Sequence, residues 1–549
     1  MAEKGPVRPK VVLAEPIAPA GVAALSLECD VVDLSGVDPA RLEEALIDAS
    51  GLVVRSATRV DDGLISAGPR LRVIGRAGVG VDNIDVEAAT RRGVLVVNAP
   101  LANTVSAAEH AFALILSLAR YIPQADASTR QGAWDRKSFT GVELSGKTLG
   151  IVGLGRIGTL VAQRAAAFDM RVLAHDPFVG PERARRMGVE MVDLEGLLGA
   201  SDFISIHLPM TPDTEGLFGK DTLTRCKPGV RIVNTSRGGI IDELALAEAV
   251  RSGHVAGAAL DVFASEPPTD SPLFELAAVV VTPHLGASTI EAQDKAGVQV
   301  AEAVAAALRG ELVASAVNVD LGGEVSDEVQ QFLPVAEQLG RVFIGLAGGA
   351  PDEIRVDARG RIAEGETKPL GLAVLKGWLQ AVSTDPVSYV NVGALAEAKG
   401  IDLVLEQSEE SPDYVSVLTV SGLVGGSDVS VAATVSRKGP VLVEILGHDL
   451  ELPISRHMLI LRNADLPGVI GRVGSYLGDE SINIANMVVG RSRKTDDGAM
   501  MGLNLDQPMS DAQVGQMKQL PGIVEARYVE VGNILAERPT HVQGRLRFE

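Results

Sequence analysis

Three residues suited to oxidising a secondary alcohol follow apolar runs in the middle of the sequence. Arg237 comes after RIVNTS, Glu266 comes after GAALDVF, and His284 ends VVVTPH. Removing hydride from an alcohol carbon requires a base for the hydroxyl proton and a cation for a neighbouring carboxylate, tasks that suit histidine and arginine. A carboxylate such as Glu266 would orient the imidazole and stabilise its charged form. We therefore predict that these three residues are catalytic.

Each of the three also has an ordinary structural role open to it. Arg237 would suit a protein surface, Glu266 a proline-stiffened loop and His284 a turn. Taken singly, these roles explain each residue as well as catalysis does. All three, however, follow late strands of one predicted sheet, and ligands of open α/β sheets bind outside the carboxyl ends of the strands.

A glycine motif earlier in the same series predicts a dinucleotide site. Residues 153–158 read GLGRIG after an apolar run, a helical pattern follows, and Asp176 closes the next run. The glycines would let a pyrophosphate approach N–H groups at the positive end of a helix. Asp176 would bind both ribose hydroxyls and repel a 2′-phosphate, which favours NAD over NADP; its structural alternative is a solvated loop residue. The turn residues expected at the cofactor are Gly153, Gly155, Arg156, Ile157 and Gly158.

Two series of short apolar runs, the first of them rich in valine, must position these residues. The runs alternate with helical patterns, which predicts buried parallel strands joined by crossover helices. The second series has six runs, as a dinucleotide-binding doubly wound sheet does. A helical pattern over 288–309 then leads to Val317 and would return the chain to the first unit. The first series reads KVVLAEP, DVVDLS, GLVVRSAT, LRVIGRAG and VLVVNAP, and the second TLGIVG, RVLAHD, FISIHLP, RIVNTS, GAALDVF and VVVTPH.

A long helix is predicted from Ser106 to Tyr121, between the two series. Ser106 and Glu109 have the spacing of a capping box, so Asn103, Thr104 and Ser106 are expected to cap the helix rather than to catalyse. Among the other histidines, His110 and His175 are expected to be structural. His207 and Leu208 are expected to line the nicotinamide side of the cleft.

After a Gly-rich acidic stretch from Leu321 to Asp327, the pattern changes twice. Helices and alternating strands indicate an α+β domain, and from His457 the order βαββαβ is that of a ferredoxin-like domain. The predicted fold class is thus α/β, with two doubly wound parallel-sheet domains followed by the α+β domain and the ferredoxin-like domain. The predicted boundaries are 8–104 with 289–320 for a discontinuous substrate domain, 105–288 for a Rossmann domain, 328–452 for the α+β domain and 456–532 for the last.

Composition excludes several classes of protein. The 549 residues carry a formal net charge of −21, which disfavours nucleic acid as a partner. Two cysteines allow neither a disulfide framework nor a four-cysteine zinc site, and no metal is expected. No apolar run reaches the ~20 residues that a membrane span needs. A cytoplasmic protein is the expectation.

The motifs GLGRIG, HLPMT, NTSRGG, DVFASEP and TPHLGAST strongly resemble the D-2-hydroxyacid dehydrogenase family. VRSAT, GRAGVGVDNID and the run beginning at Trp134 resemble its long-form members. Those members oxidise D-3-phosphoglycerate to 3-phosphohydroxypyruvate with NAD, the first step of serine biosynthesis, and the resemblance implies that activity. It assigns the catalytic roles to Arg237, Glu266 and His284. It implies cofactor contacts at Val79, Arg156, Ile157, Asp176, Leu208, Thr235, Asp261, His284 and Gly286, and substrate contacts at Arg55, Ser56, Gly80, Asn83 and Arg237.

The ferredoxin-like segment resembles an ACT domain, and the one before it the intervening domain of long-form enzymes. By this resemblance, serine would bind near the turn Asp465–Gly468 and at Asn483 on the second strand, with Asn463 where relatives often carry an aromatic residue or histidine. A turn and a strand-edge asparagine also have structural uses. The implied regulatory residues are Asn463, Asp465 and Asn483.

Other functions and assignments stay open on the sequence. A glyoxylate or hydroxypyruvate reductase would share the catalytic residues, although the long tail argues against it, and an NAD-sensing binding protein would need no turnover. ACT domains usually pair and the loop at Trp134 serves dimer contacts in the family, so a homo-oligomer, with a tetramer as the first guess, is expected. The basic residues that could bind the substrate phosphate are Arg55, Arg59, Arg76 and Lys137.

Overall fold

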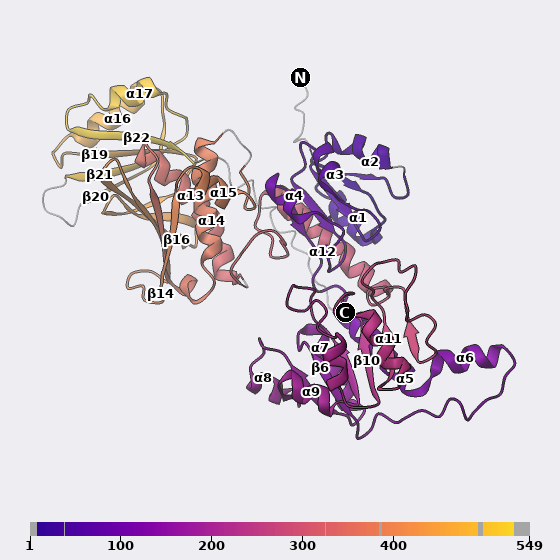
Figure 1. Ribbon diagram of the computed structural model, residues 1–549. Helices are drawn as coiled ribbons and strands as arrows, with labels where there is room; N and C mark the ends of the chain where they lie inside the picture. Colours follow the sequence, from indigo (N-terminus) through magenta and orange to yellow (C-terminus); the bar gives the residue numbers. More distant parts are fainter. Residues whose placement is uncertain (1–7, 38, 324, 384–386, 492–497, 532–549) are drawn as a thin grey trace, which may run out of the picture.

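The computed structural model describes residues 8–37, 39–323, 325–383, 387–491 and 498–531 (Figure 1). Its strands form four sheets, two of them wholly parallel and two mixed or antiparallel. This confirms the fold class predicted from the sequence. The proposed domain boundaries stay predictions, and the last of them, residue 532, lies outside the described residues.

The N-terminal sheet has five parallel strands in the order β2-β1-β3-β4-β5. Its central strands are buried valine and leucine runs, because helices cover both faces. Helix α12 packs against α1 and β4, so the chain returns to this sheet after building the second one (Figure 1). The bounds are β1 Lys10–Leu13, α1 Pro19–Ser26, β2 Asp30–Asp33, α2 Pro39–Leu46, β3 Gly51–Val54, α3 Asp62–Ala67, β4 Val73–Arg76, α4 Val86–Arg91, β5 Leu95–Val97 and α12 Ile290–Arg309.

The second sheet is also parallel, in the order β12-β11-β10-β9-β6-β7-β8. It contains the six predicted strands and one more, the two-residue β8, which is too short to leave a pattern in the sequence. The order reverses between β6 and β9, and a dinucleotide binds at such a switch point. The bounds are α5 Thr104–Arg120, α6 Ile122–Arg130, β6 Thr148–Val152, α7 Arg156–Ala167, β7 Arg171–His175, α8 Pro181–Arg186, β8 Glu190–Met191, α9 Leu194–Ala200, β9 Phe203–Ile206, α10 Lys220–Arg225, β10 Val230–Asn234, α11 Glu243–Arg251, β11 Val255–Leu260 and β12 Val279–Val281.

The predicted capping box at the start of α5 is wrong. The helix begins at Thr104, and Asn103 occupies the N-cap position without a side-chain hydrogen bond. Ser106 lies inside the helix, where its hydroxyl is 2.7 Å from that of Thr289. Glu109 pairs with Arg164 instead of reaching back to the helix start. Packing against the segment that leads into α12 therefore overrides the local capping signal.

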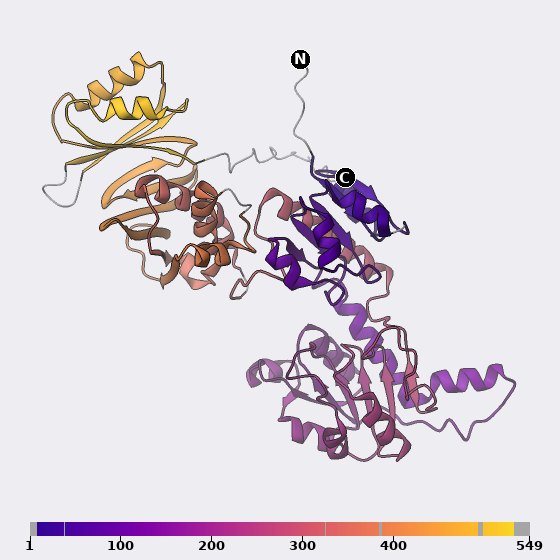
Figure 2. The same ribbon diagram turned by 45° about the horizontal axis from the view of Figure 1, so that its top comes forward.

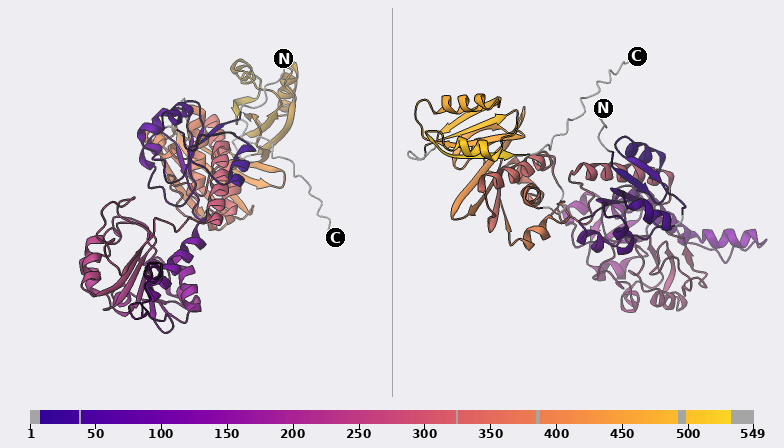
Figure 3. Two further views of the ribbon diagram at one scale, coloured as in Figure 1. Left: turned by 90° about the vertical axis from the view of Figure 1, so that its right-hand side faces the viewer. Right: turned by 90° about the horizontal axis from the view of Figure 1, so that it is seen from above.

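Helix α6 projects away from the second sheet (Figure 2; Figure 3) and buries none of its residues. It follows Tyr121, whose left-handed conformation ends α5 and turns the chain by 63°. Among the described residues, no single helix is long and apolar enough to span a membrane. The bent pair of α5 and α6 passes that test by length and composition alone.

The last two sheets pack against each other, and the four-stranded sheet has a second hydrophobic cluster under its helices. The six-stranded sheet has the order β14-β13-β15-β16-β17-β18, and the four-stranded sheet has the order β20-β21-β19-β22 that the ferredoxin-like topology requires. Strand β18 packs on β20, and buried side chains of both units form one hydrophobic cluster. The bounds are α13 Asp327–Ala347, β13 Glu353–Gly360, η1 Arg361–Glu364, α14 Lys368–Val382, α15 Val392–Ala398, β14 Asp402–Ser408, β15 Ser416–Val424, β16 Ser427–Ser436, β17 Gly439–Ile445, β18 His448–Pro453, β19 His457–Asn463, α16 Val469–Asp479, β20 Ile484–Arg491, β21 Ala499–Leu505, α17 Asp511–Met517 and β22 Ile523–Glu530.

Candidate active site

The three predicted catalytic residues follow three neighbouring strands of the second sheet. Strands β10, β11 and β12 are parallel, and Asn234, Leu260 and Val281, near or at their carboxyl ends, are aligned across the sheet. The segments that follow these strands therefore leave the sheet at the same edge. Arg237, Glu266 and His284 lie on these segments.

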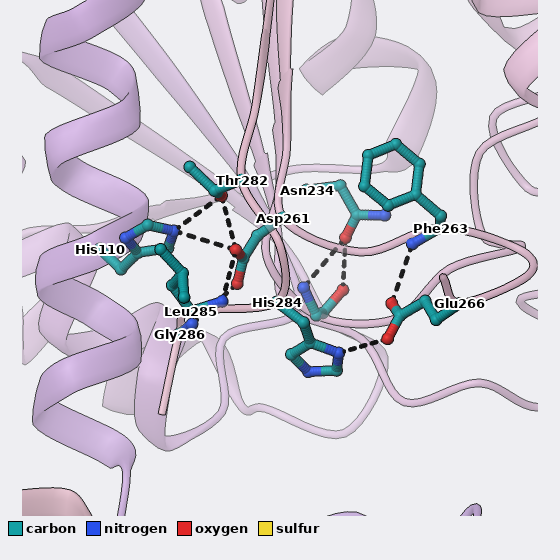
Figure 4. Close-up of polar contacts among 10 residues, drawn as sticks. His110, Asn234, Asp261, Phe263, Glu266, Thr282, His284, Leu285 and Gly286 are labelled. Atoms are coloured by element: carbon teal, nitrogen blue, oxygen red, sulfur yellow. Dashed lines mark hydrogen bonds and ion pairs between the residues drawn. The ribbon is translucent and has the colours of Figure 1, made fainter. Parts of the chain in front are cut away.

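His284 and Glu266 form a hydrogen-bonded pair (Figure 4). The distance from Nδ1 of His284 to Oε2 of Glu266 is 2.7 Å, and the other carboxylate oxygen accepts a hydrogen bond of 3.0 Å from the N–H of Phe263. The histidine side chain is 48% exposed, so its ring reaches solvent while its partner holds it. Because Nδ1 is engaged by Glu266, Nε2 is the nitrogen available to a substrate hydroxyl.

A buried aspartate fixes the turn that carries His284 (Figure 4). Asp261 accepts hydrogen bonds from the N–H groups of Leu285 and Gly286, at 2.7 and 2.8 Å, and from the hydroxyl of Thr282. Burial would raise the pKa of Asp261, but hydrogen bonds from His110 and Thr282 and from the Leu285 amide outweigh it and lower the pKa. The ionised carboxylate thus supports the left-handed conformation of His284, whose φ is 54°.

Two of the sequence expectations meet at this turn. His110, expected to be structural, is 3.2 Å from the carboxylate of Asp261 and 3.1 Å from the hydroxyl of Thr282. Asp261 itself, expected to line the cofactor, holds the backbone of the predicted contact Gly286. The structure therefore places both residues beneath the loop, where they position it.

Arg237 reaches from the second sheet to the first. Its Nη1 donates to the carbonyl of Ser236 at 2.8 Å, and its Nε is 3.4 Å from a carboxylate oxygen of Asp82. A Cβ atom on Gly80 would lie only 2.3 Å from Nη2 of Arg237, so a larger residue there would displace the guanidinium from this position. The guanidinium therefore lies at the junction of the two sheets, beside a predicted substrate residue.

A second and a third arginine join this cluster. Arg76 ends β4 and its Nε is buried with no hydrogen-bond partner among the described residues. Burial lowers the pKa of Arg76, the nearby charges of Arg237 and Arg55 lower it further, and the carboxylates of Asp82 and Glu15 act in the opposite direction. The buried Nε–H of Arg76 can donate to an anion. Among the described residues, neither Arg59 nor Lys137 forms a side-chain hydrogen bond or ion pair with this cluster.

The other predicted substrate residues lie on the same side of the first sheet. Ser56 is exposed on the loop after β3. Asn83 donates through its side-chain amide to the carbonyls of Arg55 and Thr58, at 2.9 and 2.6 Å. The side chain of Asn83 therefore holds the backbone of the loop that carries Arg55 and Ser56. Val79 accepts a hydrogen bond at its carbonyl from Asn98, at 2.6 Å.

The glycine motif forms a turn that fits a pyrophosphate. Gly153 has a φ of 96°, and a Cβ there would lie 2.5 Å from the carbonyl oxygen of His207. A Cβ on Gly158 would lie 2.2 Å from the carbonyl of Gly153, whereas Gly155 faces open space. Helix α7 begins at Arg156 without a side-chain cap, which leaves its first N–H groups to a ligand.

Further predicted cofactor residues surround this turn. Asp176 follows β7 and accepts from the N–H groups of Leu154 and Phe178, at 2.8 and 2.9 Å, so its carboxylate is held at the edge of the motif. Thr235 has a buried hydroxyl without a hydrogen-bond partner in the described part of the chain. The ring of His207 is 2.9 Å from the hydroxyl of Ser205, and burial lowers the pKa of His207 to about 4. His207 is therefore neutral near neutral pH.

We predict that Asp176→Ala narrows the preference for NAD over NADP. The variant loses the acceptor for the ribose hydroxyls and the charge that repels a 2′-phosphate, and each such interaction is worth about 1.5–3 kcal/mol. The ratio of kcat/KM values for the two cofactors should fall by about tenfold or more. Glu190→Ala, which removes a carboxylate paired with Arg171 at the start of β7, is the control. Unchanged selectivity in the Asp176 variant would refute the assignment.

The predicted regulatory residues do not converge within one chain. Asn463 ends β19, its Oδ1 is buried without a partner among the described residues, and Asp465 follows in the turn. Asn483 precedes β20, so its predicted place on that strand is wrong; it donates to Asp506 at 2.5 Å. The strand register puts Asn463 level with Ala499, and Asn483 beside the opposite end of the same sheet.

Sequence reasoning missed several residues of the site. Thr282 was read only as part of the last strand, although its hydroxyl contacts Asp261. Asp82 lies within the GRAGVGVDNID motif but had no role assigned. Glu15, between a strand and a proline, also went unnoticed, and its carboxylate accepts hydrogen bonds from three N–H groups of the substrate loop. A carboxylate directly after a parallel strand was the available signal.

Three family models match successive parts of the chain. Residues 112–286 match the D-isomer specific 2-hydroxyacid dehydrogenase, NAD binding domain; residues 328–446 match the D-3-phosphoglycerate dehydrogenase intervening domain; and residues 457–522 match the ACT domain. The NAD-binding match covers the glycine turn and His284, so NAD is the cofactor that this site takes.

Relatives that match this chain over most of its length are D-3-phosphoglycerate dehydrogenases. A D-3-phosphoglycerate dehydrogenase of Mycobacterium leprae is 47% identical over 96% of this chain and 99% of its own length. Its counterpart in Mycobacterium bovis is 49% identical over 92% of this chain and 96% of its own length. A solved glyoxylate reductase from Paecilomyes thermophila is 32% identical with a TM-score of 0.51, and it covers 56% of this chain but 98% of its own. The chain therefore belongs to the D-3-phosphoglycerate dehydrogenases, NAD-dependent members of the D-2-hydroxyacid dehydrogenase family that carry an intervening and an ACT domain.

Proposed function

We propose that the chain oxidises D-3-phosphoglycerate to 3-phosphohydroxypyruvate with NAD, the first step of serine biosynthesis. The observation that carries this proposal is the pair His284–Glu266 at the same sheet edge as Arg237, which in turn lies beside Arg55 and Arg76. A base, an oriented carboxylate and a cluster of guanidiniums match a substrate with a hydroxyl, a carboxylate and a phosphate.

Each residue has one task in the proposed reaction. His284 takes the proton of the 2-hydroxyl at Nε2, and Glu266 stabilises the resulting imidazolium through Nδ1. Arg237 binds the substrate carboxylate through two parallel hydrogen bonds and stabilises the oxygen that becomes the carbonyl. Bound NAD supplies the acceptor for the hydride. In the reverse direction, the protonated His284 returns its proton to the same oxygen.

Arg55 and Arg76 are the proposed phosphate ligands. Arg76 is the stronger choice, because its buried Nε has no partner among the described residues and Gly78 leaves room for its guanidinium: a Cβ there would lie 1.8 Å from Nη1. Asp82 and Glu15 offset part of the charge of the three arginines, but the buried Nε–H of Arg76 still lacks an acceptor among the described residues. The phosphate of the substrate would supply that acceptor.

Steady-state kinetics with a panel of 2-oxo acids test this function. NADH oxidation is measured with 3-phosphohydroxypyruvate, hydroxypyruvate and glyoxylate. We expect the phosphorylated acid to have the highest kcat/KM, by about a hundredfold or more, since a charged hydrogen bond is worth about 1.5–3 kcal/mol and the phosphate makes several. A preference for glyoxylate would favour the reductase alternative, and no turnover with any of them would favour an NAD-sensing binding protein.

Serine is the proposed effector of the ACT domain. The buried Oδ1 of Asn463, which has no hydrogen-bond partner in the described part of the chain, lies beside the turn at Asp465 and can accept a hydrogen bond from an ammonium or hydroxyl group. Because Asn483 lies at the other end of the sheet, a bound serine would have to take these contacts from two ACT domains. Calorimetric titration with L-serine tests this proposal, and absence of heat and of inhibition at millimolar serine would contradict it.

The projecting α6 arm is the proposed dimer contact. The arm buries no residue of its own, and Trp134 on the loop that follows is 77% exposed, with Arg136 5.9 Å over its ring. A large aromatic side chain exposed on an extended arm is typical of an interface.

We also propose a cytoplasmic location, since both cysteines are free thiols.

We predict that Trp134→Ala weakens self-association through this arm. Burial of an indole at an interface is worth about 2 kcal/mol or more, which corresponds to a rise of at least about thirtyfold in the dissociation constant. Light scattering over a dilution series measures it, with Phe178→Ala, another exposed aromatic, as the control. Identical dissociation curves for the two variants would remove the arm from the interface.

A further inference from the structure

The carboxylate of Glu15 lies behind the substrate loop. Glu15 follows β1, and the next strand in the sheet, β3, leads into the loop 55–58. Oε1 of Glu15 accepts hydrogen bonds from the N–H groups of Arg55 and Thr58, both at 2.9 Å, and Oε2 accepts one of 3.1 Å from Ala57. Three of the four N–H groups in the loop therefore point at one side chain.

Asn83 binds the carbonyl groups of the same loop. These carbonyls belong to Arg55 and Thr58, and the carbonyl of Asn83 accepts from Val60 at 2.8 Å. The loop is thus fixed through its backbone, which leaves the side chains of Arg55 and Ser56 outside this network. Arg55 also lines a cavity of about 330 Å³ together with Pro16 and Ala77.

The hydrogen bonds to the loop favour the ionised form of Glu15. Burial would raise the pKa of Glu15, but the backbone N–H groups of Thr58, Arg55 and Ala57 outweigh it and lower the pKa. The carboxylate is therefore ionised across the neutral range. A side chain with fewer acceptor lone pairs cannot satisfy all three donors at once.

We infer that Glu15 is a positioning residue for substrate binding: its carboxylate holds the loop 55–58 in the shape that presents Arg55 and Ser56 to the phosphorylated end of the substrate. This inference rests on the proposed function, since it assigns the loop to that substrate. Glu15 touches the loop from behind and takes no part in the transfer of hydride or proton. Its loss should therefore affect substrate affinity more than turnover.

Three variants and the wild type, each as the full chain, test the inference. Glu15→Gln keeps the shape but loses the charge, Glu15→Asp keeps the charge on a shorter side chain, and Asp33→Asn is the matched control. Asp33 also ends a strand at this sheet edge, but it caps its own loop through the N–H of Ser35 at 2.9 Å. The measurements are KM for 3-phosphohydroxypyruvate, KM for NADH, kcat and the thermal midpoint.

We expect Glu15→Gln to raise KM for 3-phosphohydroxypyruvate about tenfold, with kcat and KM for NADH changed less than about twofold. Glu15→Asp should lie between this variant and the wild type, and it carries the test if Glu15→Gln does not fold. Asp33→Asn should match the wild type in all kinetic constants. An unchanged substrate KM in both Glu15 variants, or an equal rise in KM for NADH, would overturn the inference. A wild type without turnover would refute the proposed function instead.

Discussion

His284→Asn is expected to lower kcat/KM for 3-phosphohydroxypyruvate by about three orders of magnitude, the usual range for loss of a positioned acid–base group. The substitution removes Nε2, which is the nitrogen left to the substrate once Nδ1 is engaged by Glu266. KM for NADH should change little, because His284 acts on the oxygen of the substrate. Steady-state kinetics, with NADH binding followed separately by fluorescence, measure both quantities.

A second histidine in the same sheet provides the control. His254 precedes β11, at the opposite sheet edge from the proposed site. His254→Asn should keep kcat within about twofold of the wild type, because it is the same substitution at a residue far from the proposed site. If both variants lost activity equally, or if His284→Asn kept it, the role of the imidazole would have to be abandoned.

Arg237→Lys is expected to lower kcat/KM by about a hundredfold or more, although the charge is kept. A lysine ammonium cannot make the two parallel hydrogen bonds of a guanidinium, and one charged hydrogen bond is worth about 1.5–3 kcal/mol. The loss should appear in KM for the 2-oxo acid as well as in kcat, because the same contact holds the ground state and the reacting oxygen.

The arginine prediction also has a matched control. Arg251 ends α11, and its exposed guanidinium donates to the carbonyl of Pro272 at 3.4 Å. Arg251→Lys should leave both kinetic constants unchanged within about twofold. A lysine at position 237 with wild-type KM would show that the substrate carboxylate is bound elsewhere.

The sequence predicted what depends on periodicity and on order along the chain. Short apolar runs marked most of the strands of the two parallel sheets, and the position of Arg237, Glu266 and His284 after late strands placed them at one edge. Both inferences use the same rule, that consecutive parallel strands carry their following loops on one side. Comparisons then agreed with the family that the motifs suggested.

What the sequence did not predict depends on contacts between distant segments. The hydroxyl of Ser106 meets Thr289, and local spacing alone read Ser106 as a helix cap. The approach of Arg237 to Asp82 joins two sheets, and the hydrogen bonds of Glu15 join two strands that are separated by a helix-strand-helix unit. Such contacts become visible only when the sheets are assembled, because the sequence pattern around one partner does not show which distant residue it meets.

The stereochemical product of a single reaction tests the central claim most directly. Wild-type protein, NADH and 3-phosphohydroxypyruvate are allowed to react to completion, and the product is identified by a stereospecific assay. The proposed roles of His284, Glu266 and Arg237 predict reduction of the 2-oxo group, and membership of the D-isomer specific family predicts one D-3-phosphoglycerate for every NADH consumed. Formation of the L-isomer, or no loss of NADH, would contradict it.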